Sequence, residues 1–292
     1  MIEAERQEGE GEGAWTPDPA AYAYTTELSP FGWAWEFLRR EPEFRHAAAT
    51  ARLRERATGV DAARSRRGAD GVVRHVVRRP EPEAARWGLE LFADPDANGL
   101  EASVFWTSDA VGGDLEAALD PGLDPGVDAL HLADVPGCKA VLVLPGGRIR
   151  VLVEAPGYAE TLSAPAPAEL AFDRLAFVLG LGAWSELEVR MARLAAFAAF
   201  CRRPSGDEAV DAPWRRSARR LADALVALDG WRAGRSYREI AHAFHDPLEI
   251  EDDWRGPGAI KLRMRRRVAA GLALRQGGYR RLLTADRGRR WR

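Results

Sequence analysis

The segment GAIKLRMRRRVAAGLALR, residues 258–275, decides the fold of the C-terminal part of the chain. At about 100° per residue, its apolar side chains fall on one arc of roughly 120°, which is wide enough to seat a helix on a core. Those side chains are Ile260, Met264, Val268, Gly271 and Leu272. The opposite arc carries Leu262, Arg263, Arg265 and Arg266, with Lys261 at its margin. Arg267 lies nearer the apolar side, where we expect its stem to cover the core while its charge reaches water. The pattern predicts one amphipathic helix from about Pro257 to Arg275.

Two further helical segments precede this helix at short distances along the chain. The nearer one, SYREIAHAFHD at residues 236–246, begins with Ser236 as an N-cap, and Glu239 follows three residues later as in a capping box. The other one, WRRSARRLADALVALDG at residues 214–230, also has apolar side chains at helical spacing. We expect an acidic loop with Trp254 immediately before the basic helix. Three helical segments, of which the last is rich in arginine, are typical of a helix-turn-helix.

Charge is divided unevenly along the chain. The whole sequence has 42 basic and 44 acidic side chains, a net charge of −2. From Pro213 onward there are 20 basic and 9 acidic side chains, a net of +11, which leaves 22 and 35 before it, a net of −13. Eight basic residues and no acidic one occur between Lys261 and Arg281. Any solvated helix has a charged arc opposite an apolar one, but it ordinarily mixes signs, so a single sign favours an anionic partner.

We expect the basic helix to enter the major groove of double-stranded DNA, where arginine can bond guanine and nearby cations can pair with phosphates. Arg263, Arg265 and Arg266 are predicted to reach base edges, and Tyr279 is expected to pack back on the three-helix core. The predicted DNA-binding residues are Lys261, Arg263, Arg265, Arg266, Arg267, Arg280 and Arg281.

In the N-terminal part of the chain, the spacing of apolar residues is first typical of helices and then typical of strands. One helix is expected after Ser29 as its N-cap, and a second from Pro42, ended by Gly59. Beyond residue 72, short segments rich in valine, isoleucine, phenylalanine and tryptophan alternate with turn residues, which predicts strands. The segments are GVVRHVV, WGLELF, ASVFWT, ALHL, KAVLVL and RIRVLVE, with a hairpin turn at Gly146 and Gly147 between the last two.

The predicted fold class is α+β, with N-terminal helices and a small, mostly antiparallel sheet, then an all-helical C-terminal domain that contains a helix-turn-helix variant. The expected divisions are a disordered acidic tail at 1–20, an α+β domain at 21–155, a proline-rich linker at 156–168, a helical DNA-binding domain at 169–285 and a basic tail at 286–292. Leu187, Met191, Leu194 and Ala198 form an apolar stripe, which is either a candidate homo-oligomer interface or ordinary core.

Composition disfavours secreted and membrane proteins. Cys138 and Cys201 are too few and too isolated for a disulfide scaffold or a cysteine zinc site. The N-terminus lacks the basic start and apolar run of a signal peptide. The most apolar window, residues 191–201, is much shorter than the roughly 20 residues that span a bilayer. We therefore expect a cytoplasmic protein without a membrane partner.

The motifs that would indicate an enzyme or a metal site are incomplete. Asp94, Asp96 and Asn98 imitate the start of a calcium loop, but Phe105 stands where a bidentate glutamate is needed. His242 and His245 have no third ligand near them in the sequence. The chain has no phosphate-binding loop, zinc-protease motif or hydrolase nucleophile motif. We expect no enzymatic activity, no cofactor and no metal.

Two regions together resemble a known family. ALDGWRAGRSYREIAHAFHD at residues 227–246, then Trp254, then LRMRRRVAAGLALRQGGYRRLL at residues 262–283 resemble the helix-turn-helix domain of the RovC-like and FseA-like transcriptional regulators of proteobacteria. AAYAYTTELSPFGWAWEFLRREPEFR, residues 20–45, is similar to the regulator-like domain that often precedes it, for which WAWEFLRR is the hallmark. WGLELFADPD followed by VFW also matches that longer architecture.

This resemblance implies activation of transcription, with targets among genes for the excision and transfer of integrative and conjugative elements or for secretion. It implies promoter DNA as the partner, with RNA polymerase or another regulator as further candidates. Where relatives have Trp-Lys-Thr-Ser, this chain continues from Trp254 with Arg-Gly-Pro-Gly, and Met264 replaces an aspartate, so the recognised bases do not carry over. The alternatives are an antiactivator that binds another regulator, which the +11 charge disfavours, and an accessory DNA-bending recombination factor.

Overall fold

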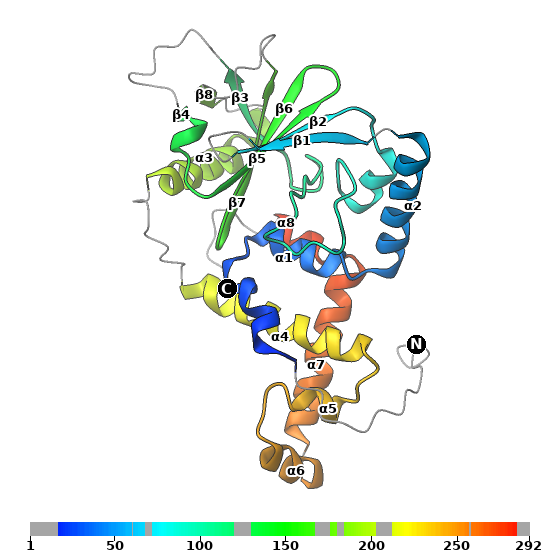
Figure 1. Ribbon diagram of the computed structural model, residues 1–292. Coiled ribbons are helices and arrows are strands. Elements are labelled where there is room, and N and C mark those ends of the chain that lie inside the picture. The colour runs from blue at the N-terminus through cyan, green and yellow to red at the C-terminus, as the bar shows by residue number, and fades with distance from the viewer. Residues whose placement is uncertain are drawn as a thin grey trace.

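Figure 1 shows a computed structural model of the chain, in which a sheet with helices on both faces lies beside a group of helices from the C-terminal part. The structure describes residues 17–59, 61–67, 72–119, 130–166, 176–179, 184–202, 212–256 and 258–284. The predicted α+β class is confirmed. Most of the expected acidic tail and all of the expected basic tail lie outside the described residues.

The first helices form where the sequence predicts them. The 3-10 helix η1 (Pro19–Glu27) leads into α1 (Pro30–Leu38), whose N-cap Ser29 accepts a hydrogen bond from the backbone N of Gly32 at 2.9 Å. Helix α2 (Pro42–Thr58) ends at Gly59. All nine residues of α1 are buried, so this helix lies at the centre of the N-terminal core.

The sheet runs in the order β1-β2-β5-β6-β7-β3-β8-β4. Its strands are β1 (Ala63–Arg67), β2 (Val73–Val77), β3 (Leu115–Leu119), β4 (Leu130–His131), β5 (Cys138–Leu144), β6 (Arg148–Ala155), β7 (Tyr158–Pro165) and β8 (Ala176–Leu179). Of the seven described strand pairs, only β2 with β5 and β3 with β7 are parallel. The prediction of a mostly antiparallel sheet is confirmed, as is the hairpin between β5 and β6 at Gly146 and Gly147.

Helices cover both faces of the central strands. Val141, Val151 and Leu162 belong to a core that includes Phe197 and Phe200 of α3 (Leu187–Cys201). Ala140, Leu142 and Leu152 belong to the core on the other face, which contains α1. Because successive strand residues point to opposite faces, strands buried on both sides have continuous apolar runs, as in residues 140–144 of β5 and residues 151–153 of β6.

Three expectations about this region are wrong. Tyr158–Pro165, expected within a linker, is strand β7, because its backbone pairs along its whole length with β6. Ala176–Leu179, expected in a helix, is strand β8, which pairs with β3 and β4. The segments WGLELF and ASVFWT meet only at an isolated bridge between Leu89 and Trp106, preceded by the 3-10 helix η2 (Pro82–Trp87).

Helix α3 buries a face that overlaps only in part with the apolar stripe predicted from the sequence, since Leu194 of that stripe packs against the sheet core and Met191 does not. Its buried residues are Arg193, Phe197 and Phe200. Arg193 forms a 2.5 Å salt bridge with Glu160 of β7, and both side chains are buried. Met191 of the predicted stripe is 54% exposed.

The C-terminal helices are α4 (Ala212–Arg232), α5 (Tyr237–Ala241), α6 (Pro247–Arg255), α7 (Ala259–Ala273) and α8 (Arg280–Thr284), with a π-helical turn at Leu274–Gly278 before α8. The acidic segment before α7 is therefore helix α6 and not the expected loop, because Asp246 caps it by accepting a hydrogen bond from the backbone N of Leu248. Helices α4 and α7 cross closely at Gly271, where a Cβ would lie 2.6 Å from the carbonyl oxygen of Ala224.

The end of the chain packs on the N-terminal part. The Tyr279 hydroxyl donates a 2.9 Å hydrogen bond to the Trp87 carbonyl oxygen, and its ring lies 5.8 Å from that of Trp106. Leu283 lies in the same core as α1. The prediction that Tyr279 packs on the three-helix core is therefore wrong, because the chain turns back toward α1 at Gly277, whose φ of 109° suits glycine.

One ion-pair network joins the N-terminal and C-terminal parts (hereafter the clamp: Tyr22, Glu36, Arg40 and Asp229). The Arg40 guanidinium donates to both carboxylate oxygens of Asp229, at 2.7 and 2.8 Å, and to Glu36 Oε2 at 2.6 Å. The Tyr22 hydroxyl donates to Asp229 at 2.9 Å. Burial alone would raise the pKa of Asp229, but its hydrogen bonds with Arg40 and the charge of that residue outweigh burial and hold the pKa below its ordinary value. The carboxylate therefore stays ionised inside the protein.

We expect Arg40→Ala to lower the free energy of unfolding by about 3–5 kcal/mol, because it leaves Asp229 and the fully buried Glu36 without their shared counter-charge. Arg54→Ala is the matched control, since it removes only the exposed pair with Glu83 and should cost less than about 1 kcal/mol. Urea denaturation followed by tryptophan fluorescence measures both. Equal urea midpoints for the two variants would contradict the role of the clamp.

Glu154 should make stability depend on pH. Its carboxylate accepts a 2.6 Å hydrogen bond from the Ser29 hydroxyl, and burial raises its pKa from 4.5 to about 7. A raised acid pKa favours the folded state below pH 4.5, and this advantage is lost as the pH rises through 7. From pH 5 to pH 8 the free energy of unfolding should therefore fall further in the native chain than in the Glu154→Gln variant, by as much as about 3 kcal/mol. Parallel denaturation curves at both pH values test this, and equal losses would show that Glu154 is ionised at both.

Candidate nucleic-acid interface

The basic helix α7 is seated on a small core of its own. Its buried residues are Ile260, Met264, Val268 and Gly271, as the sequence predicts. The three side chains pack with Ala227 of α4, Ile240 of α5 and Ile250 of α6, and Gly271 lies against Ala224 of α4. Because three helices contact one face of α7, its orientation is fixed and its opposite face is left toward solvent.

The N-terminus of α7 is held by an acidic side chain from α6. Asp253 Oδ2 accepts hydrogen bonds from the backbone N of Ile260 at 2.8 Å and of Lys261 at 3.4 Å. These two N–H groups belong to the first turn of α7, where backbone N–H groups have no hydrogen-bond acceptor within the helix. Asp253 of this acidic segment therefore caps the basic helix. Glu251, in turn, pairs with Arg255 on the same helix at 2.5 Å.

Five exposed residues in the first half of α7 form what we term the outward face: Lys261, Leu262, Arg263, Arg265 and Arg266. None of its four cations forms an ion pair with any carboxylate in the described parts of the chain. The structure therefore brings these predicted site residues together in one cationic surface.

Arg267 has a different environment from the outward face. Its guanidinium pairs with Asp223 of α4 at 2.6 Å and lies 4.1 Å from the centre of the Phe244 ring. The prediction that Arg267 lies toward the apolar side is confirmed, but the expectation that its charge reaches water is wrong, because Asp223 pairs with the guanidinium. The partners could not be predicted, because Asp223 is 44 residues away in the sequence and has no pattern that identifies it.

Arg280 and Arg281 are not part of the outward face. Both lie on α8, which follows the turn at the opposite end of α7 and packs against α1 (Figure 1). Arg280 donates a hydrogen bond to the Arg86 carbonyl oxygen at 2.5 Å and lies over the Tyr279 ring. The predicted set of seven basic residues is thus divided by the fold into the outward face, a helix-holding residue and two residues on α8.

Other exposed basic residues lie on the helices that contact α7. Arg238 of α5 was not predicted, and its only sequence signal is its place in the SYREIA segment. The first half of α4, which precedes the crossing of α4 with α7 at Ala224, also carries exposed arginines: Arg215, Arg216, Arg219 and Arg220.

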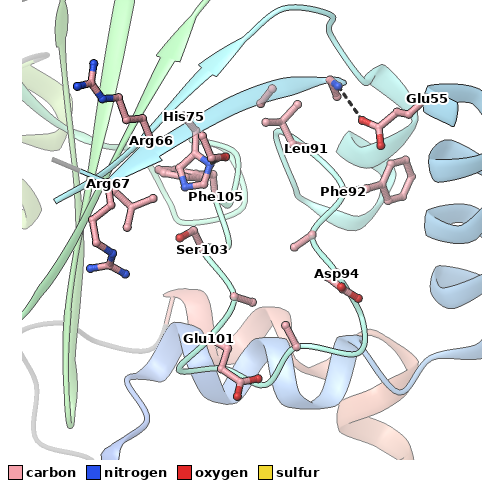
Figure 2. A pocket seen from close by; sticks show the side chains of 17 residues that line it. Glu55, Arg66, Arg67, His75, Leu91, Phe92, Asp94, Glu101, Ser103 and Phe105 are labelled. Carbon is pink, nitrogen blue, oxygen red and sulfur yellow. Dashed lines mark hydrogen bonds between the residues drawn. The ribbon is translucent and has the colours of Figure 1, made fainter. Parts of the chain in front are cut away.

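A pocket of about 520 Å³ lies in the N-terminal part, between strands β1 and β2 and residues 91–105 (Figure 2). Its carboxylates are already engaged: Glu55 accepts from Ala62 N, Asp94 pairs with Arg52, and Glu101 accepts from Asn98 N. Arg66 and Arg67 extend away from the hollow in Figure 2. A ligand site needs several polar groups that converge on the ligand, and these charged groups do not converge. The outward face of α7 therefore remains the candidate site.

The described residues contain no cluster of three or more histidine, cysteine, aspartate or glutamate side chains that could hold a metal ion. None of their helices combines the length and apolar character needed to cross a membrane.

Comparison with protein families agrees with this geometry. The model of the RovC type, described as a T6SS transcription factor DNA-binding domain, matches residues 180–284, which include the whole outward face. The model of the proteobacterial transcriptional regulator-like domain matches residues 15–91, which include α1 and α2. None of the curated proteins compared matches the chain. The resemblance seen in the sequence is confirmed, and the chain is a transcriptional regulator whose C-terminal part is similar to the RovC DNA-binding domain and whose N-terminal part is similar to the proteobacterial transcriptional regulator-like domain.

Proposed function

We propose that this regulator binds double-stranded promoter DNA by placing the outward face of α7 in the major groove, with α5 and α7 acting as a helix-turn-helix. The observation that carries the proposal is the outward face itself, in which four exposed cations have no carboxylate partner among the described residues. A helix with its side chains is about 10–12 Å across, which fits the roughly 12 Å major groove.

The contacts that seat α7 prepare it for this role. Asp253 fixes the first turn, and Arg267 ties the middle of the helix to Asp223 of α4. A helix held by three neighbouring helices loses little further freedom when it binds, so less of the interaction energy is spent on ordering it. The outward cations can then displace the counterions that surround DNA phosphates.

We further propose that the protein activates transcription in the cytoplasm and that secretion genes or genes of mobile elements are its targets. The T6SS description of the matched domain family supports the secretion targets. We also propose that it acts as a homo-oligomer through the exposed side of α3 and the turn before it. Trp184, Val189 and Met191 there are 85%, 63% and 54% exposed, which supports an interface.

Replacing Arg263 and Arg265 by alanine should weaken binding to duplex DNA and reduce the slope of log affinity against log salt by about 0.9 for each lost phosphate contact. Arg255→Ala is the control, because Arg255 is an exposed arginine of the same module whose charge is already paired with Glu251. Fluorescence anisotropy with a labelled duplex at several salt concentrations measures both effects. If the double variant kept the affinity and salt slope of the control, α7 would not be the binding element.

Arg266→Ala and Arg267→Ala should have opposite phenotypes although the residues are adjacent. Arg266 is exposed and unpaired within the described chain, so its loss should leave stability within about 0.5 kcal/mol while weakening DNA binding. Arg267 holds Asp223 and Phe244, so its loss should lower stability by about 1 kcal/mol. Urea denaturation and anisotropy on both variants separate the two roles. Equal effects of both substitutions on stability would refute the assignment.

A further inference from the structure

We infer that Leu262 and Arg266 together read the bases, by recognising a thymine and a guanine within one or two base pairs of each other, while Arg263 and Arg265 contact phosphates. This inference rests on the proposed function and adds to it the DNA feature that the protein selects. It differs from the sequence prediction, in which Arg263, Arg265 and Arg266 all reach base edges.

The direction of each side chain on α7 follows from the position of its buried row. At about 100° per residue, the buried residues Ile260, Met264 and Val268 share one direction. The opposite direction passes between Leu262 and Arg266, which are one turn apart. Arg263 and Arg265 point roughly 80° to either side of it. When the helix lies in the major groove, Leu262 and Arg266 therefore point at the base edges on the groove floor. Arg263 and Arg265 point at the phosphate backbones on either side.

The chemistry of the central pair matches two different base edges. Leu262 is 47% exposed and cannot form hydrogen bonds, and the thymine methyl is the apolar group that the major groove offers. Arg266 is exposed and has no carboxylate partner in the described residues, so its guanidinium is free to bond O6 and N7 of guanine. Residues four apart rise about 6 Å along a helix, which corresponds to one or two steps of about 3.4 Å in DNA.

The rest of the exposed face confines base reading to the first half of α7. Ala269, Ala270 and Ala273 follow on the same side and are exposed. Their side chains end at Cβ, so they can form no hydrogen bond to a base. They also leave room for the helix backbone to approach the groove, which lets Leu262 and Arg266 reach its floor.

Modified bases test the inference directly. The full chain first selects its preferred duplexes from a random library, and these should contain a thymine and a guanine within one or two base pairs. Replacing that thymine by deoxyuridine removes only the methyl and should weaken binding about fourfold. Replacing that guanine by 7-deazaguanine removes only N7 and should weaken binding at least about fivefold.

Variants assign each effect to its residue. Leu262→Ala should lose the response to deoxyuridine and keep the response to 7-deazaguanine, and Arg266→Ala should do the reverse. Arg263→Ala is the matched control, because it should bind every duplex more weakly while keeping both responses. All three positions are exposed, so folding is preserved.

The outcomes separate this inference from the function on which it rests. A chain that selects no duplex overturns both. A chain that binds duplex DNA but tolerates both modified bases overturns base reading by this pair and leaves DNA binding intact. Persistence of the deoxyuridine response in Leu262→Ala, or of the 7-deazaguanine response in Arg266→Ala, also overturns it.

Discussion

The bidentate pair between Arg40 and Asp229 is the interaction on which the rest of the structure depends. It connects α1 to α4 inside the protein, and it is reinforced by Glu36 and Tyr22. The residues that carry the family resemblance meet here: Arg40 ends WAWEFLRR, and Asp229 lies in ALDG. GGYRRLL packs on the same core through Tyr279 and Leu283. These motifs are therefore explained by the contact between two modules, through which the regulator-like part supports the DNA-binding part.

The orientation of α7 follows from this support. Asp253 holds its first turn, Gly271 allows its close crossing with α4, and the turn at Gly277 returns the chain to α1. The described contacts use the apolar arc and Arg267, which leaves the outward cations without partners of opposite sign among the described residues. The same division explains why Arg280 and Arg281, although basic and close in sequence, belong to the contact between the modules and not to the outward face.

The sequence predicts what depends on local spacing. The caps at Ser29 and Ser236, the β5–β6 hairpin and the apolar arc of α7 were all readable from neighbouring residues. Strand β7 was not, because its flanking prolines are typical of a linker and its pairing with β6 decides its conformation. Strand β8 was missed because a short apolar run fits a helix as well as a strand. The partners of Arg267 and Tyr279 come from segments far apart in the sequence, so no local pattern identifies them.

The most direct test of the account is to map which helix touches DNA. In a chain carrying Cys138→Ser and Cys201→Ser, an iron–EDTA cleavage reagent would be attached at Ala259→Cys, the exposed first residue of α7, or at Leu53→Cys on the exposed side of α2. Cuts at defined positions of the bound duplex are expected from residue 259 and none from residue 53. Cuts from residue 53 alone, in a chain that still binds DNA, would contradict the proposed role of α7.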